Sequence, residues 1–461
     1  MPSRRQFVAA AGSALAALAG CVDGETDPVT AVPTTDRTVR SATETAAEPP
    51  ETDRPTDTEA PTEDSLAEWS PAWTLETEFG HVLALTRDGT DLYATLSDDG
   101  SRSAIAAVDY AAERLRWRTA FEGDAVVTSF LEQGNARDKW GVGVRDGTLY
   151  VVTGNTDDYA WTALHALDPA TGERRWSFRR ERELTVAGVI GDTVVAGGRE
   201  FFVPESTHDT PEEPLPTAVY GLDAASGSVR WTREFRGVTA GGTAASRVVV
   251  GEGDRVTGLD AEGHTLWSAS TTDPRAVLAV GDGVVVAAAD GEGSTLRAFG
   301  SDGKERWRDT RPVEEFLAVG DRLYALGDET VAYDADGDVR WQVDGYSQWP
   351  LLAPDGETLY ARAAVRANAV DAFSIPGGGR RFRYETPSNN GWPAGATDEM
   401  VVAEAITPDL ADFTSLYAVD GESGSPMAVY RPTDAVFDVA GVDETAYAAI
   451  GDRVVAFERP E

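Results

Sequence analysis

The sequence is poor in the residues that form disulfides, thiolate metal centres and basic surfaces. Of its 461 residues, one is cysteine, three are methionine and four are histidine. The single cysteine, Cys21, excludes an intrachain disulfide and a metal cluster built on thiolates. Only Lys139 and Lys304 are lysines. No apolar run reaches the roughly 18 residues of a transmembrane helix without a glycine.

Acidic residues outnumber basic ones by 78 to 40, for a formal charge of −38. Such a surface repels phosphate, so we expect no nucleic-acid partner. It also repels itself in dilute buffer, whereas at molar salt the Debye length falls to roughly 3 Å and screens the repulsion. The composition resembles that of proteins from salt-loving archaea. An ordinary soluble acidic protein is the alternative.

The N-terminal 68 residues are typical of export and anchoring. Arg4 and Arg5 precede a short apolar stretch, which resembles a twin-arginine signal over residues 1–20. The stretch ends in Leu-Ala-Gly before Cys21, which resembles a lipobox, so we expect a lipid on the Cys21 thiol; a cysteine there by coincidence is the alternative. Residues 22–65 contain eleven Thr and six Pro but no Leu, Ile or aromatic residue. Residues 21–68 are therefore predicted to be a lipidated, disordered tether.

From about residue 69 to residue 461 one motif repeats. An Asp that follows an apolar strand is followed by a Gly turn, and then by a Trp seven or eight residues after the Asp. The Asp can bond the turn backbone, and the Trp can fill the space between neighbouring units. Ser374 to Phe382 and Asp420 to Ala428 keep the spacing but lose the Trp. The residues of the motif are Asp109, Trp117, Asp168, Gly172, Trp176, Asp223, Gly227, Trp231, Asp260, Trp267, Trp307, Asp334 and Trp341.

Two further strand patterns precede each motif, so each unit is predicted to be four short antiparallel strands joined by Gly/Asp turns. Four-stranded units of about 40 residues are typical of β-propeller blades, and the fold class is all-β. The literal count is eight units plus a terminal half copy. Residues 73–76 are predicted to complete that half copy and to close the ring, which gives nine blades.

The Ala-x-Asp-x-x-Thr-Gly-x-x-x-Trp register, as in residues 166–176, resembles the quinoprotein-type (PQQ-like) propeller repeat over residues 73–458. The resemblance implies eight blades, the number usual in that family, and we favour eight over nine. With its lipobox, the chain also resembles in architecture the lipoprotein propeller of bacterial outer-membrane barrel assembly.

The resemblance also implies a possible quinone-dependent dehydrogenase, with a quinone, a calcium ion and a disulfide. That disulfide cannot form here, and Asn389-Asn390 is the only amide pair beside a predicted first strand. The Asp334–Asp338 stretch resembles a calcium loop, but Gly345 stands where such a loop needs a terminal Glu. His165 lies on an alternating strand and is interpreted as a packing residue. We therefore expect no catalytic residue, no metal and no PQQ or Ca²⁺.

All long insertions, at 120–138, 198–217 and 404–415, are predicted on one face of the disc, at fourth-to-first and second-to-third connections. Aromatic residues gather there, and we interpret this face as a binding surface. Rings that merely cap the core are the alternative. The candidate residues are Trp140, Trp161, Phe201, Phe202, Trp349 and Trp392.

These observations together predict a monomeric, non-catalytic propeller on the extracellular face of the cell membrane. We expect a lipid anchor, and another envelope or membrane protein as the partner that it binds or scaffolds. A membrane-associated PQQ-dependent dehydrogenase and a propeller that binds a small ligand or sugar are the two alternatives.

Overall fold

A computed structural model describes residues 65–89, 91–98, 102–122, 125–126, 142–154, 161–181, 184–198, 216–236, 238–244, 246–290, 293–345, 347–363, 368–387, 391–406 and 414–460. These residues form strands joined by turns and no α-helix. None of them lies in a helix that is long and apolar enough to cross a membrane. The predicted signal peptide, Cys21 and most of the tether lie outside the described residues and remain predictions.

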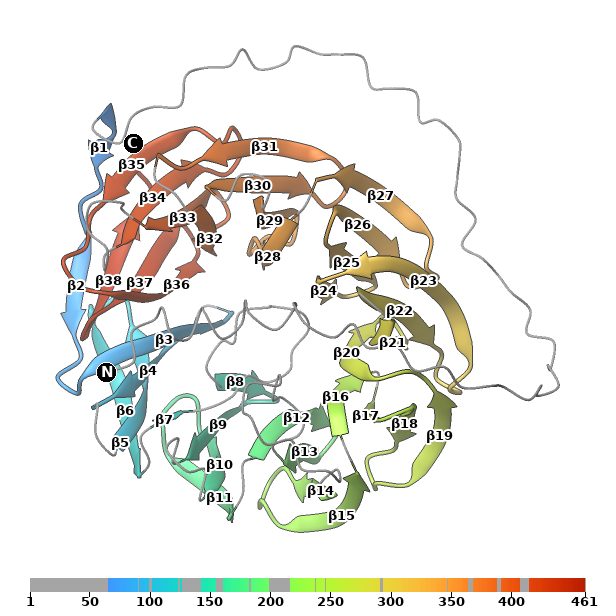
Figure 1. Cartoon of the computed structure of the whole chain (residues 1–461). Coiled ribbons are helices and arrows are strands. Elements are labelled where there is room, and N and C mark those ends of the chain that lie inside the picture. Colours follow the sequence, from blue (N-terminus) through green and yellow to red (C-terminus); the bar gives the residue numbers. More distant parts are fainter. Residues whose placement is uncertain are drawn as a thin grey trace, which may run out of the picture.

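The described strands form nine antiparallel sheets arranged in a ring, which we number as blades 1 to 9 (Figure 1). The fold is therefore the predicted all-β propeller. Of the two blade numbers considered, nine is found, the literal repeat count, and the family's usual eight is not.

Blades 1 to 4 follow the order of the chain. Their strands are β3 (His81–Asp88), β4 (Asp91–Ser97), β5 (Arg102–Asp109) and β6 (Arg114–Glu122); β7 (Ala125–Val126), β8 (Val142–Arg145), β9 (Thr148–Gly154), β10 (Thr162–Leu167) and β11 (Arg174–Arg180); β12 (Leu184–Ile190), β13 (Thr193–Gly198), β14 (Pro216–Asp223) and β15 (Val229–Arg236); and β16 (Val238–Ala244), β17 (Arg247–Glu252), β18 (Arg255–Leu259) and β19 (Thr265–Ser270).

Blades 5 to 8 continue in the same order. Their strands are β20 (Pro274–Val280), β21 (Gly283–Asp290), β22 (Gly293–Phe299) and β23 (Glu305–Val313); β24 (Glu315–Val319), β25 (Arg322–Leu326), β26 (Glu329–Asp334) and β27 (Val339–Asp344); β28 (Ser347–Leu352), β29 (Thr358–Ala363), β30 (Ala369–Ser374) and β31 (Arg380–Glu385); and β32 (Gly391–Ala396), β33 (Met400–Ile406), β34 (Thr414–Asp420) and β35 (Pro426–Tyr430).

Blade 9 joins the two ends of the folded chain. It contains β36 (Val436–Val442), β37 (Thr445–Ile450) and β38 (Arg453–Glu458), and its fourth strand is β2 (Trp73–Glu76) from the N-terminal end. Strand β2 pairs antiparallel with β38, with Trp73 opposite Ala456. The predicted closing strand is therefore confirmed. An additional short strand, β1 (Ala67–Glu68), precedes the expected start of the propeller and pairs with β35.

One predicted insertion is placed differently in the structure. Strands β7 and β8 both pair with β9, so together they form the first strand of blade 2. Residues 127–141 interrupt that strand, whereas the sequence placed the insertion 120–138 between a fourth and a first strand. The alternation in 142–145 is too short to show that it continues a strand that begins at Ala125. Insertions 198–217 and 404–415 lie between second and third strands, as predicted, although β33 extends to Ile406.

The motif tryptophans join neighbouring blades. Each lies on a fourth strand and contacts the third-to-fourth turn of the next blade along the chain. Trp117 of blade 1, for example, donates its indole N–H to the carbonyl of Pro169 in blade 2, at 3.0 Å. A Cβ on Gly172 in that turn would lie 2.4 Å from the Trp117 ring, so only glycine fits there. The same contact recurs from Trp176 to Ala224, Trp231 to Ala261, Trp307 to Ala335 and Trp341 to Ile375.

The motif aspartates hold the turns that receive these rings. Asp168 Oδ1 accepts the backbone N–H groups of Ala170 and Thr171, at 2.9 and 3.1 Å. Asp334 Oδ1 accepts those of Asp336 and Asp338 in the same way, and Asp334 Oδ2 pairs with Arg340 at 2.6 Å. The stretch that resembles a calcium loop is thus a blade turn whose first carboxylate is already bonded. Asp109, Asp223 and Asp260 make the equivalent turn bonds.

We call the boundary between two neighbouring blades a seam. Trp176 and Trp267 offer a matched test of the tryptophan contact across it. Both are 7 % exposed, but Trp176 Nε1 donates at 2.8 Å to Ala224, while Trp267 Nε1 is buried without a hydrogen-bond partner. We expect Trp176→Phe to lower the free energy of unfolding by about 1–2 kcal/mol more than Trp267→Phe, because only the first loses a hydrogen bond and leaves the half-buried Ala224 carbonyl without its indole donor. Denaturant unfolding of the two variants in the same salt checks this; equal losses would contradict it.

Candidate functional site

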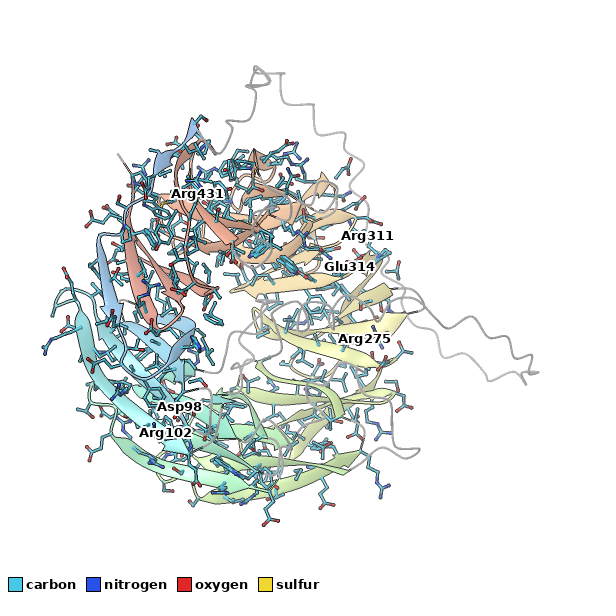
Figure 2. All side chains as sticks on the ribbon, turned by 60° about the vertical axis from the view of Figure 1, so that its left-hand side comes forward. Asp98, Arg102, Arg275, Arg311, Glu314 and Arg431 are labelled. Atoms are coloured by element: carbon cyan, nitrogen blue, oxygen red, sulfur yellow. The ribbon has the colours of Figure 1, made fainter. Side chains whose placement is uncertain are left out.

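The first strands of the blades surround the axis of the ring, and neighbouring first strands contact one another (Figure 1). Their N-terminal ends belong to the face that carries the fourth-to-first and second-to-third connections. Asp98, Arg275, Glu314 and Arg431 come from such connections or lie next to them, and Figure 2 shows them in four different parts of the ring. This is the face on which the sequence placed the binding surface.

A β-bulge recurs near the start of the first strand. In blades 1, 3, 4, 5, 7, 8 and 9 the register between first and second strands shifts within the first few residues. A bulge leaves a residue outside the ladder and changes the direction of its side chain, and bulges are frequent at the rims of closed β structures. The ring therefore has a rim at which single side chains depart from the regular pattern.

Trp349 lies in the largest of these irregularities. Gln348 pairs with Arg362 and Leu351 with Tyr360, so Trp349 and Pro350 both fall outside the ladder. Trp349 has a φ of 53°, a conformation that costs a bulky residue free energy and that clusters at functional sites. A proline fits a bulge because it has no N–H to donate to a ladder. The backbone N–H of Trp349 donates to Glu315 of blade 6 at 2.5 Å.

Polar groups surround Trp349 and its neighbour Trp392. The two rings meet edge to face, with centroids 5.9 Å apart, and so join blades 7 and 8. The Arg362 guanidinium lies 4.5 Å from the centre of the Trp349 ring. Burial lowers the pKa of Arg362, while Glu315 acts in the opposite direction. The indole N–H of Trp392 donates to Glu404 at 3.2 Å, and the Glu404 side chain is buried.

A second ring pair continues the rim. Phe437 lies in the bulge of blade 9, and its ring centroid is 5.8 Å from that of His81, the first residue of blade 1. Both side chains are half-buried. We call Trp349, Trp392, Phe437 and His81 the aromatic rim; its members come from four consecutive blades, 7, 8, 9 and 1.

The aromatic rim contains only two of the predicted binding residues. Trp161 lies just before β10, on the outer half of blade 2, where Arg179 covers its ring at 4.0 Å. It is therefore three blades away from Trp392. Trp140, Phe201 and Phe202 lie outside the described residues. Trp392 is 9 % exposed and so caps the core, whereas half-buried Trp349 keeps part of its ring accessible.

The sequence did not identify Phe437, His81 or Trp69 as functional residues. Phe437 and His81 occupy the first or second position of a first strand, which is the position that made Trp392 a candidate, so the same rule would have found them. Trp69 lacks the motif Asp and Gly altogether. The signal in the sequence was Ala428, which leaves the tryptophan position of one repeat unit without an aromatic residue.

The carboxylates described near the axis accept hydrogen bonds from N–H groups of the chain itself. Asp438 accepts the backbone N–H groups of Leu85 and Val439, both at 2.9 Å, so each of its oxygens is bonded. Glu315 and Glu404 accept the N–H groups of the two rim tryptophans. Among the described residues, no three His, Cys, Asp or Glu side chains are placed to hold a metal ion. Asn389 and Asn390 lie outside the described part of the chain.

His165 is buried between two hydroxyl groups. Thr153 Oγ1 lies 2.9 Å from Nε2 and Ser177 Oγ 2.8 Å from Nδ1, while the Phe121 ring is 4.6 Å away. Burial, with a smaller effect of Arg174, lowers the pKa of His165 to about 3. Both ring nitrogens are thus occupied by partners within blade 2, consistent with a packing residue.

Because the folded state resists protonation of His165, it should make the protein less stable in acid. The unfolded histidine binds a proton below pH 6.5 and the folded one only near pH 3, so stability is complete above pH 6.5 and falls between these values. The loss is about 1.4 kcal/mol per pH unit for this one group. Denaturant unfolding from pH 7 to 4.5 should show a steeper decline for the wild type than for His165→Gln. Parallel declines would contradict this account.

One family model matches the chain, and several solved structures are similar to it. The family model described as outer membrane protein assembly factor BamB matches residues 62–254 and 252–391. BamB from Moraxella catarrhalis is similar in structure, with 14 % identity, 85 % of this chain and 99 % of that chain covered, and a TM-score of 0.45. A europium-containing methanol dehydrogenase has 12 % identity, 85 % and 86 % covered, and a TM-score of 0.47. Sqt1 from Saccharomyces cerevisiae has 10 % identity, 86 % and 100 % covered, and a TM-score of 0.45. No curated protein sequence matches the chain.

Proposed function

Because the chain belongs to the family described as outer membrane protein assembly factor BamB, we propose that it is a non-catalytic module that binds or scaffolds another envelope protein. The family match over residues 62–391 is the observation that carries this proposal. The family description refers to assembly of other proteins, and a partner that is itself an envelope or membrane protein follows from it. We extend the proposal to a monomeric propeller held on the extracellular face of the cell membrane by a lipid on Cys21.

The chemistry of the aromatic rim supports binding over catalysis. Aromatic side chains bury much area at little entropic cost, and they dominate the energy of protein interfaces. Trp349 is held by a cation–π contact to Arg362 and by a bond from its backbone to Glu315, so its ring is positioned before a partner arrives. Preorganisation of this kind lowers the entropic cost of association. The same side chains do not form a nucleophile–base pair.

The charge of the chain supports the proposed location. Residues 1–20 contain Arg4 and Arg5 and no acidic residue, so removal of a signal peptide takes the formal charge from −38 to −40. A surface of that charge stays soluble in brine because screening removes its self-repulsion. Export as a folded protein through a twin-arginine signal and retention through Cys21 then place the module outside the cell.

Crosslinking on intact cells, followed by affinity capture and mass spectrometry, tests the proposal. We expect the wild-type chain to retain an envelope protein and Trp349→Ala to retain at least tenfold less of it, the loss expected for a hot-spot residue. Leu266→Ala is the matched control, since Leu266 is an exposed apolar side chain (51 % exposed) on the fourth strand of blade 4, remote from the aromatic rim. Trp161→Ala shows whether the outer part of blade 2 also contributes.

Two outcomes would contradict the proposal. The first is equal capture by Trp349→Ala and the wild type. The second is dye-linked oxidation of alcohols or sugars by the purified chain after addition of the quinone and Ca²⁺, which would favour the dehydrogenase alternative.

A further inference from the structure

The seam between blades 8 and 9 lacks the aromatic residue that the other described seams receive from a fourth strand. Trp73 in β2 packs against the buried cluster between blades 9 and 1, as does Tyr110 of blade 1. Phe382 takes the tryptophan position in blade 7 and lies against Gly424 in the turn of blade 8. In blade 8 itself the corresponding residue is Ala428, on β35. An alanine in place of a tryptophan would leave a gap in the wedge that the rings fill elsewhere.

Trp69, from the segment before blade 1, occupies this gap. Its side chain is 3 % exposed and belongs to the same buried cluster as Ala428, Val436 and Phe457, which come from blades 8 and 9. Its ring centroid lies 4.6 Å from that of Phe457. The indole N–H donates to the carbonyl of Glu458 at 2.8 Å.

The acceptor of this bond is of the same kind as at the other seams. Trp117 and Trp176 donate to carbonyls just after the third strand of the next blade. Glu458 is the last residue of β38, which is the third strand of blade 9. Trp69 therefore makes the seam contact of blade 8, although it belongs to a segment 359 positions before Ala428 in the chain.

The backbone around Trp69 is fixed to the outer edge of blade 8. Ala67 pairs with Ala428 and Glu68 with Val429 in a parallel register, and the Trp69 N–H donates to the Val429 carbonyl at 2.8 Å. Leu66 packs against the cluster shared by blades 7 and 8. Figure 1 shows β1 outside β35, on the outer circumference of the ring.

The same segment then closes the next seam. Strand β2 forms the fourth strand of blade 9, and its Trp73 ring lies 5.7 Å from Tyr447. Tyr110, in the turn after Asp109 of blade 1, lies 6.0 Å from Tyr447 on the other side of that seam. Two tryptophans four residues apart thus serve two consecutive seams.

We propose that residues 66–76 form a clasp in which Trp69 replaces the missing seam tryptophan of blade 8. The clasp joins three consecutive blades, 8, 9 and 1, and is continuous with the segment that precedes it. A pull on the N-terminal segment therefore acts on Leu66, on the pairing of β1 with β35 and on the buried Trp69 contact before it reaches the closing strand β2. Loss of Trp69 opens the seam between blades 8 and 9 while the other seams stay closed.

The proposal can be tested in the full chain by moving the tryptophan from position 69 to position 428. Trp69→Ala removes the ring, Ala428→Trp restores a ring at the regular motif position, and the double variant combines them. We expect Trp69→Ala to lower the apparent Tm by about 5 °C, as for a buried tryptophan in a domain of this size. The double variant should recover at least half of that loss. Trp161→Ala, which removes a half-buried tryptophan away from any seam, is the control and should change the Tm by about 1 °C.

Hydrogen exchange locates the effect. In Trp69→Ala we expect amide exchange in β34, β35 and β38 to become at least tenfold faster, with blades 3 to 6 unchanged, because only one seam has opened. A Tm and an exchange pattern like those of Trp161→Ala would overturn the proposal, as would faster exchange spread evenly over all blades. If the double variant is no more stable than Trp69→Ala, Trp69 does not act as the replacement ring.

Discussion

The closed propeller depends on one repeated contact. In it, the aromatic side chain of a fourth strand packs against the third-to-fourth turn of the next blade. Twisted four-stranded sheets around an axis diverge at their outer edges. An aromatic side chain, which buries about 150–250 Å² of surface, fills the wedge between two of them. The indole N–H also fixes the orientation of the tryptophan side chain, because it donates to a carbonyl of the turn in the next blade. Aspartate and glycine belong to the same device, since Asp168 holds the turn and Gly172 lets the ring approach the backbone.

Because these contacts join the blades at their outer halves, the first strands near the axis can differ from blade to blade. With the seams fixed at the outer half, the first strands can carry bulges near the axis without loss of the ring. Trp349 shows how far the departure goes, with its positive φ and two consecutive residues outside the ladder. A strained backbone of that kind persists only where surrounding contacts hold it in place. For Trp349 these are the hydrogen bond to Glu315 and the cation–π contact with Arg362. The rim is therefore the part of the propeller whose side chains can vary while the architecture stays the same.

Ion pairs form a second, weaker layer on the tight-turn face. An arginine directly precedes the seam ring in six blades, and Arg116, Arg230 and Arg306 each pair with an aspartate in the first-to-second turn of their own blade. These groups are exposed, so the pairs contribute little, and less still in concentrated salt. Where salt screens these pairs, the seams rest on apolar burial and on the indole hydrogen bonds.

The sequence by itself determined the blade unit, the register of its Asp, Gly and Trp, and the closing strand Trp73–Glu76. These follow from contacts that recur at fixed spacing, so each copy supports the others. The literal repeat count gave nine blades, and only the preference taken from the family pointed to eight. The sequence also placed the connections 198–217 and 404–415 on one face of the disc, and the order of the strands agrees with that placement. It grouped Trp161, from a loop, with Trp349, from the start of a first strand, because both were predicted on the same face.

Only the tertiary structure decided which of those residues come together. The pairing of Trp349 with Trp392, the bulges that direct the rim, and the split first strand of blade 2 depend on register between strands, and register carries no local signature in so short a strand. Trp69 is the clearest case. Its role depends on Ala428, 359 positions away in the chain, and a gap between two blades exists only once the ring has closed. Contacts that repeat at fixed spacing can be predicted from a sequence. A single contact that replaces a missing aromatic residue at one seam can be identified only from the tertiary structure.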